Sequence, residues 1–517
     1  ARDHRYTHTY DRRQRQMCIL DRPVLADLAG TLGSRDEVVV PPNAIPAGCE
    51  RITPQMLPLI DLDQGDIDRI AARVPGGVAN IQDIYALSPL QEGILFHHLL
   101  AAQGDPYLLV AQVAFADRAL LDRYVAALQQ VVDRHDILRT AFFWQGLSMA
   151  AQVVLREARL SVEEIALDPR DGPAGEQLAR RFDPRHYRID LSEAPLQRLK
   201  VAYDAGQQRW VVQWLQHHLI GDHSTMETLF AEVGVLLEDS AAVLAPAQPF
   251  RNLVAHARLG MPAEEHERFF RDMLGDIDEP TTPFGLSDVH RDGDAVAQAF
   301  LHLPQALNDR LRAQARRLGV SLASLCHLAW GQVLARATGR EAVVFGTVLF
   351  GRMHGGEGSD GAMGLFINTL PLRLDLDGTG VEDSVRAAHA RLAGLLRHEH
   401  ASLATAQRCS GVPAQTPLFS ALLNYRHNSP PSEVSQGEAD PGLEWLGAEE
   451  RTNYPFALSV EDFGDALGLT AQVVDTLPAE RVCGYMERAL ESLADALETA
   501  PDTPVRELDV LPAGERR

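Results

Sequence analysis

The clearest pattern of apolar and polar positions is an aromatic and β-branched run at residues 209–215. Its alternation predicts a largely buried strand. The next eight residues, 216–223, read Gln-His-His-Leu-Ile-Gly-Asp-His, and after them Ser224 followed by Glu227 has the spacing of a helix cap with a capping box. The pattern therefore predicts a strand, a short loop and a helix, with three histidines and an aspartate on the loop. Loops fixed between rigid elements often carry chemistry.

Strand and helix patterns alternate through the whole chain. In the first half we predict helices at 89–102 and 120–134 and strands at 108–115, 141–144, 152–155 and 196–203. After an Ala/Pro-rich stretch at 239–249 we predict strands at 297–303, 343–349, 365–374, 418–424, 457–461 and 467–474, and helices at 307–318, 321–338, 380–397 and 479–499. Interleaved elements predict an α/β (α+β) class, and two halves of comparable size suggest a pseudo-dimer in one chain.

The pattern also divides the chain into four parts. Residues 1–35 show no apolar period, and we expect a non-native-looking or disordered arm. Residues 36–80 are Val/Pro-rich with one short amphipathic segment, and we expect a linker. Two globular subdomains are expected at 81–248 and 249–515.

Composition excludes several classes of partner. The 517 residues are 45% hydrophobic and 23% charged, as in ordinary globular proteins, and the net charge of −23 makes nucleic acid and anionic membranes poor partners. The five cysteines are widely spaced without a CxxC pair, which indicates reduced thiols in the cytoplasm. No apolar run reaches the roughly 18 to 20 residues of a membrane span, and no signal peptide is present.

A series of motifs then points to one family. The sequence His217-His218-x-x-x-Asp222 is similar to the active-site motif H-H-x-x-x-D-G of the condensation domains of nonribosomal peptide synthetases. Further segments resemble other motifs of that family in the same order, at residues 87–93, 134–140, 183–188, 351–354 with 364–369, 423–426 and 453–456. A single short motif would be weak evidence, but this ordered series spans residues 81 to about 515.

The resemblance implies a fold and a set of partners. It implies two chloramphenicol-acetyltransferase-like subdomains in a V with a central tunnel. A donor and an acceptor thioester would enter on the phosphopantetheine arms of an upstream and a downstream carrier domain, so the chain needs no cofactor of its own. Residues 504–511 resemble the edge before an adenylation domain, and the N-terminal linker resembles the region after a carrier domain, so we expect a piece of a longer synthetase.

The resemblance also implies residue roles. His218 takes a proton from the attacking amine or holds it in line, while His217 packs or orients. A free α-amine has a pKa of about 7.7 to 8.0, so positioning can outweigh base catalysis near pH 7. Asp222 is expected to form a structural ion pair with Arg352, because a buried carboxylate needs a cation or several donors.

Two departures from the commonest pattern bear on function. His223 stands where the family usually has glycine, and it would place a bulky polar group beside the site. His97-His98-Leu99-x-x-x-x-Gly104-Asp105 matches the extended motif of dual epimerisation/condensation domains, which invert the donor α-carbon before condensation. His97 and His98 are therefore candidates for removing the α-proton.

Several residues have a plainer alternative. Arg139 and Arg352 are either tunnel supports or surface charges, and Asn453 with Tyr454 is either tunnel lining or a turn with a core aromatic. A histidine pair on a helix, such as His97 and His98, is otherwise one surface group and one half-buried group.

We expect His398 and His400 to face solvent. No metal site is expected, because the histidines lack further ligands at the usual spacing.

Three functions remain open at this point. The first is a dual epimerisation/condensation domain, and the second is an ordinary condensation domain that accepts a donor of fixed configuration. The third is a catalytically silent module that recruits another enzyme to a synthetase. The intact His217, His218 and Asp222 argue against silence.

Overall fold

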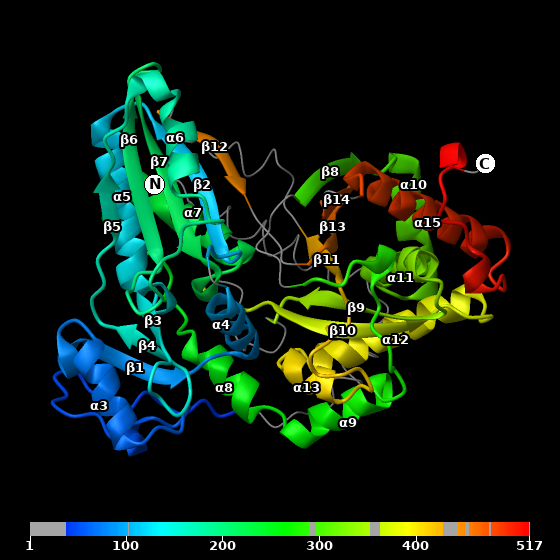
Figure 1. The fold of residues 1–517 in the computed structure, drawn as a ribbon, viewed down its shortest axis with the longest axis horizontal. Helices are drawn as coiled ribbons and strands as arrows, with labels where there is room; N and C mark the ends of the chain where they lie inside the picture. Colours follow the sequence, from blue (N-terminus) through cyan, green and yellow to red (C-terminus); the bar gives the residue numbers. More distant parts are fainter. Residues whose placement is uncertain are drawn as a thin grey trace, which may run out of the picture.

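The computed structural model of the protein describes residues 38–101, 103–289, 296–351, 362–427, 442–449, 454–474 and 477–515. Two lobes splay apart in a V, and each is built on an open sheet with helices packed against it (Figure 1). The expected mixed α/β class and two-subdomain architecture are confirmed. The expected arm at 1–35 lies outside the described residues.

A five-stranded sheet forms the N-terminal lobe, in the order β12-β2-β7-β6-β5. Its strands are β12 (Leu443–Glu449), β2 (Leu108–Phe115), β7 (Arg209–His217), β6 (Gln197–Asp204) and β5 (Ser161–Glu164). The helices of this region are α4 (Pro89–Leu100), α5 (Arg118–Arg134), α6 (Ala174–Arg181) and α7 (His223–Glu238). The fully buried Trp214 and Leu215 on β7 belong to the core of this lobe, so the strand before the histidine loop is anchored on both faces.

A smaller sheet closes the base of this lobe. It has the order β1-β4-β3, from β1 (Ile81–Ala86), β4 (Ala151–Leu155) and β3 (Thr140–Phe143). Helix α3 (Gln64–Arg73) buries Ile67 and Ile70 in the same small core. The prediction of a linker over 36–80 therefore needs correction, because apolar side chains from Ile45 onward pack into the lobe.

The C-terminal lobe holds a six-stranded sheet in the order β10-β9-β11-β13-β14-β8. Its strands are β10 (Asn368–Asp375), β9 (Ala342–Leu349), β11 (Ala421–His427), β13 (Phe456–Asp462), β14 (Leu467–Val474) and β8 (Val296–His302). The helices of this lobe are α9 (Ala263–Leu274), α10 (Gln305–Leu318), α11 (Leu322–Thr338), α12 (Val381–Arg397), α13 (Leu403–Arg408) and α15 (Ala479–Thr499). Helix α8 (Arg251–Leu259) precedes them in the chain and buries Leu253 and Val254 in the core of the N-terminal lobe. The predicted bounds of β2, β14 and α15 match the observed ones.

Strand β12 crosses from one lobe to the other and was not predicted. It follows β11 of the C-terminal sheet in the chain, yet it pairs antiparallel with β2, with Leu443 opposite Phe115 and Ala448 opposite Ala111. Figure 1 shows this orange strand at the edge of the N-terminal sheet. Met363 and Leu365 also leave the C-terminal half and lie in the core of the N-terminal lobe. The two lobes are therefore joined through shared structure.

Among the described helices, none is by itself long and apolar enough to cross a membrane. Helices α10 and α11 satisfy the length and composition criteria only together, and they are bent by 111°.

Candidate active site

The histidine loop is shorter than predicted, because regular structure reaches it from both sides. Strand β7 runs to His217, a single 3₁₀ turn covers His218–Ile220, and α7 begins at His223. Asp222, not Ser224, caps α7: its Oδ1 accepts the Thr225 N–H at 3.0 Å. The Ser224 prediction was wrong, because Asp222 has the same capping chemistry and also has tertiary partners.

The ring of His217 is fixed at both nitrogens. Its Nδ1 accepts the backbone N–H of Leu219 at 3.1 Å, so the ring proton of a neutral imidazole must sit on Nε2. Nε2 then donates to Oδ2 of Asp105 at 3.0 Å. The side chain is fully buried. His217 therefore contacts the loop backbone through one nitrogen and Asp105 through the other, and its orienting role stays a prediction.

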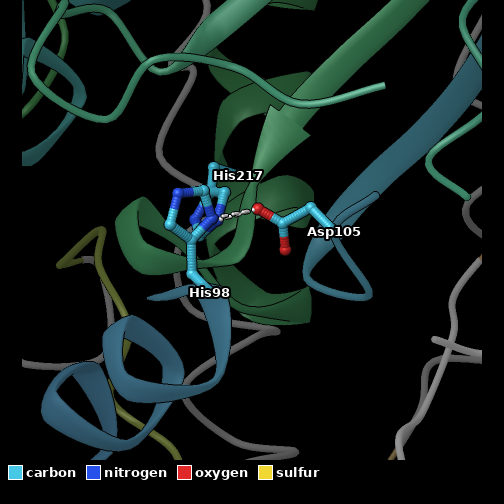
Figure 2. Close-up of side chains that lie close together, drawn as sticks. All are labelled: His98, Asp105 and His217. Carbon is cyan, nitrogen blue, oxygen red and sulfur yellow. Dashed lines mark hydrogen bonds and ion pairs between the residues drawn. The ribbon is translucent and has the colours of Figure 1, made fainter. Parts of the chain in front are cut away.

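The same carboxylate oxygen also binds His98. Nδ1 of His98 lies 2.6 Å from Oδ2 of Asp105, and Figure 2 shows the two imidazoles converging on this carboxylate. Oδ1 of Asp105 accepts the Tyr107 N–H at 3.0 Å. Asp105 is 1% exposed and has three donors. A buried carboxylate with this many donors is satisfied without a basic side chain.

A sharp turn after α4 aims Asp105 at the histidines. Gly104 has a φ of +67°, and a Cβ there would lie 2.4 Å from the Arg185 carbonyl oxygen, so only glycine fits. The Asp105 N–H donates to the Pro184 carbonyl at 2.7 Å. Arg188 donates to the carbonyls of His98 and Ala101 at the end of α4. The family-like segment 183–188 thus clamps this helix end and the turn.

Charge follows from this arrangement. Burial acts to raise the pKa of the Asp105 carboxyl, but His217 and His98 together outweigh it and hold the pKa far below its usual value. Burial lowers the pKa of the His217 imidazole, and Asp105 opposes part of that effect. At neutral pH the site therefore contains an ionised Asp105 that accepts a hydrogen bond from a neutral His217.

His98, Asp105 and His217 are also metal ligands by residue type, and their ligand atoms lie within 4.8 Å of one another. A tetrahedral zinc ion with nitrogen and oxygen ligands at about 2.0–2.2 Å would hold those atoms roughly 3.3 Å apart. The N–O separations of 2.6 and 3.0 Å are those of hydrogen bonds. The geometry of this cluster is therefore that of a hydrogen-bonded group.

His218 lies beside this cluster with a different environment. Its backbone N–H donates to the Tyr107 carbonyl at 2.9 Å, while its half-buried ring makes no hydrogen bond to a described residue. Nδ1 of this ring is buried. Gln91 donates through Nε2 to the carbonyl of Leu219 at 2.9 Å, and its Oε1 accepts from Gln152 at 2.9 Å. The turn that carries His218 is therefore held by buried amides, while its ring is left for other contacts.

Asp222 ties the loop to a segment from the C-terminal half of the chain that packs in the N-terminal lobe. Its Oδ2 accepts the N–H of Phe366 at 3.1 Å. The Thr225 hydroxyl accepts the Gly364 N–H at 3.0 Å and donates to the Gly364 carbonyl at 2.8 Å. Arg352, the predicted ion partner of Asp222, lies outside the described residues, so that pair stays a prediction.

The other predicted site residues lie apart from the Asp105 cluster. The His223 side chain is 54% exposed, and its Nε2 lies 3.5 Å from Glu227. It was expected to place a bulky group beside the site, but it points to solvent instead. Arg139 is buried and is hydrogen-bonded to Gln82 and the Leu155 carbonyl, which makes it a structural residue of the small sheet.

His97 and Tyr454 lie near Tyr107. The His97 ring is 6.1 Å from the Tyr107 ring, measured between centroids. Tyr454 stacks on Phe419 at 5.7 Å and packs on the C-terminal core. After burial, which is the largest effect, the Tyr454 hydroxyl also raises the pKa of Tyr107, so the two tyrosines are near each other across the lobes. Asn453 lies outside the described residues.

The family-like segment 134–140 also has a structural role. Arg134 and His135 contact Glu232 on α7 at 3.1 and 2.8 Å. Asp136 accepts the N–H of Phe250 at the start of α8. This segment therefore fixes α7, whose N-terminus lies at the loop.

The prediction that His398 faces solvent was wrong. His398 is buried, its Nδ1 lies 3.0 Å from Nδ1 of His266, and its ring stacks on Phe269 at 4.1 Å. His400 is partly exposed, and its Nε2 lies 3.8 Å from Glu399.

Sequence reasoning missed the roles of Asp105 and Gln91. Asp105 was named only as the last residue of the extended histidine motif, although the motif itself was the signal. Gln91 lies in the family-like segment 87–93, whose role was not predicted. Both residues reach the loop across more than a hundred residues of sequence.

Comparisons with known proteins identify the family and the fold. Residues 81–517 match a family model described as condensation domain. Malpinin synthetase and malpibaldin synthetase of Mortierella alpina are 56% identical over 513 residues and 58% identical over 498 residues. These alignments cover 99% and 96% of this chain but only 6% and 9% of the two synthetases. The first condensation domain of the calcium-dependent antibiotic synthetase, solved with a substrate analogue, superposes with a TM-score of 0.62 at 18% identity, covering 84% of this chain and all of that one. That likeness shows the fold.

Proposed function

We propose, because this chain belongs to the condensation-domain family of nonribosomal peptide synthetases, that it forms a peptide bond between two carrier-bound substrates. The acceptor α-amine attacks the donor thioester carbonyl, the C–S bond of the tetrahedral intermediate breaks, and the amide and a free thiol result. Both substrates arrive on phosphopantetheine arms of carrier domains, through a tunnel between the lobes. An adenylation domain adjacent to the chain loads the acceptor carrier.

The position of His218 carries this proposal. Its backbone is held by Tyr107 and its neighbour Leu219 by Gln91, while its ring has no hydrogen-bond partner among the described residues. A ring so placed can align the acceptor amine and accept its proton as the C–N bond forms. Asp222, with Arg352 as its proposed ion partner, holds the loop and takes no part in proton transfer.

The test is dipeptide formation between a loaded donor carrier and a loaded acceptor carrier. We expect His218→Ala to lower the rate by about 10²–10⁴-fold, the usual range for a general acid or base. His223→Ala, five residues along but exposed, is the matched control and should condense like the wild type. Unchanged turnover in His218→Ala would favour a silent recruitment module instead.

A second activity, epimerisation of the donor before condensation, is favoured by one observation. The extended motif from His97 to Asp105 is complete, and the carboxylate at its end contacts His98 at the same cluster as His217. Nδ1 of His98 donates to the Asp105 carboxylate, so Nε2 is the ring nitrogen that can accept the α-proton.

Product stereochemistry tests this second activity. With an L-donor, the wild type should give a product with a D-residue at the donor position. His98→Gln should leave that residue in the L-form or form no product, and His97→Gln is the matched comparison. A wild-type product that keeps the L-donor would establish an ordinary condensation domain.

A further inference from the structure

We propose that Asp105 is a positioning residue for peptide-bond formation, and not only a part of the extended histidine motif. Its carboxylate fixes the tautomer of His217 and, through Leu219, the orientation of the turn that carries His218. This inference rests on the proposed condensation function, and it holds whether or not the donor is epimerised.

Two hydrogen bonds fix the tautomer of His217. The Leu219 N–H points at Nδ1 and the Asp105 carboxylate accepts from Nε2. A neutral imidazole has one donor and one acceptor nitrogen, so these two partners together permit only the Nε2–H form. Without the carboxylate, the proton can move to Nδ1, and the ring can no longer accept from Leu219.

Hydrogen bonds on both sides of His218 hold the turn that carries it. The N–H of Leu219, the residue after His218, donates to Nδ1 of His217, and the Leu219 carbonyl accepts from Gln91. The N–H of His218 donates to Tyr107, whose own N–H donates to the second oxygen of Asp105. Asp105 therefore supports His218 along two routes, one on each side of it.

An amide cannot replace the carboxylate of Asp105. Oδ2 accepts from two imidazoles and Oδ1 from the Tyr107 N–H, so every partner is a donor. In Asp105→Asn the NH₂ group must face either Tyr107 or both histidines, which puts donor against donor. A serine-protease triad loses about 10⁴-fold in kcat when the same exchange leaves its histidine in the wrong tautomer.

The experiment measures kcat and KM for the loaded acceptor carrier, with a donor carrier loaded chemically in the configuration found in the product. Epimerisation is then not needed, so an effect can be assigned to condensation. For Asp105→Asn we expect kcat to fall by about 100-fold or more while KM changes less than threefold, because misplacing a reacting group by about 1 Å costs about that much.

Asp66→Asn is the matched control. Asp66 is also 1% exposed and hydrogen-bonded, to Ser148 and Arg69, but it lies on α3. It should lose stability and keep kcat within threefold of the wild type. A folded Asp105→Asn protein with wild-type kcat overturns the inference, and equal loss of kcat in Asp66→Asn does so as well.

A second variant covers the case in which Asp105→Asn does not fold. His217→Gln keeps an N–H donor toward Asp105 but places no acceptor at the position of Nδ1 for the Leu219 N–H, and the same fall in kcat supports the inference. Wild-type kcat in His217→Gln overturns it. If the wild type forms no dipeptide at all, the proposed function fails and this test is not reached.

Discussion

Each lobe buries histidines on neighbouring elements, but the partners differ. In the N-terminal lobe His98 and His217 share the carboxylate of Asp105. In the C-terminal lobe His327 on α11 donates through Nδ1 to the Ala323 carbonyl at 2.6 Å and accepts at Nε2 from the Thr347 hydroxyl at 2.7 Å.

The two environments have different electrostatic consequences. Burial lowers the pKa of His327 to about 4, although the hydrogen bond to the Ala323 carbonyl opposes this effect. Burial lowers the pKa of His217 too, but the Asp105 carboxylate opposes it. Neutral partners are enough to fix a ring inside a core, whereas a buried carboxylate costs desolvation energy that packing alone does not require. The cluster in which two imidazoles share the buried Asp105 carboxylate is therefore the better candidate for function.

Removal of the carboxylate should give the largest effect on stability. Asp105→Ala leaves two imidazole donors and the Tyr107 N–H without their acceptor, at about 1–3 kcal/mol each, and we expect the free energy of unfolding to fall by about 3–5 kcal/mol. Thr347→Val, which removes the neutral partner of His327, should cost about 1–3 kcal/mol. Urea denaturation of both variants tests the difference, and equal losses would remove the distinction between the two environments.

Acidification should act mainly on the C-terminal histidine. The folded pKa of His327, about 4, is below the unfolded value of 6.5, so the unfolded chain binds the proton first. Stability is therefore complete above pH 6.5 and falls as the pH drops toward 4, by about 3 kcal/mol. His327→Gln should remove this part of the pH dependence of urea unfolding. Parallel curves for wild type and variant would contradict it.

The amide that holds the loop should have an intermediate effect on rate. Gln91→Leu leaves the Leu219 carbonyl without its donor, and we expect kcat for dipeptide formation to fall about tenfold. Gln129→Leu is the control. Gln129 lies on α5, away from the loop, and it also donates to a backbone carbonyl, that of Ala158. A rate in Gln91→Leu equal to that of the control would show that the turn needs no support from α4.

The smallest effect is expected from the departure at position 223. His223→Gly restores the residue usual in the family, but the side chain is exposed and the helix is capped by Asp222. We expect kcat to stay within about threefold of the wild type, because an exposed side chain outside the cluster changes little. A large gain or loss would mean that this residue shapes the loop after all.

Local patterns predicted the elements and missed the long-range partners. The alternation of β7 is strong because its residues are buried, and that burial is written into the sequence as aromatic and β-branched residues. The cap of α7 was assigned two residues too late, since Asp222 and Ser224 are both good caps. Only the contact of Asp222 with Phe366 separates them.

Other features could not be read from the chain because their cause is tertiary. Strand β12 forms because it pairs with the edge strand β2, which comes from the other half of the sequence. His398 is buried because Phe269 and His266 cover it. Asp105 stands 112 residues from His217 in sequence. Spacing rules describe residues that are neighbours along one helix or strand, so they cannot predict contacts between residues far apart in the sequence.

The bonds from Asp222 and Thr225 to residues 364–366 have a mechanical consequence. They hold a segment from the C-terminal half of the chain inside the N-terminal lobe, just before that segment enters β10 at Asn368. A rotation of one lobe against the other that keeps these bonds must therefore be taken up after Phe366. The distance from His218 to Tyr107 and Gln91 then stays constant, because all three belong to the N-terminal lobe.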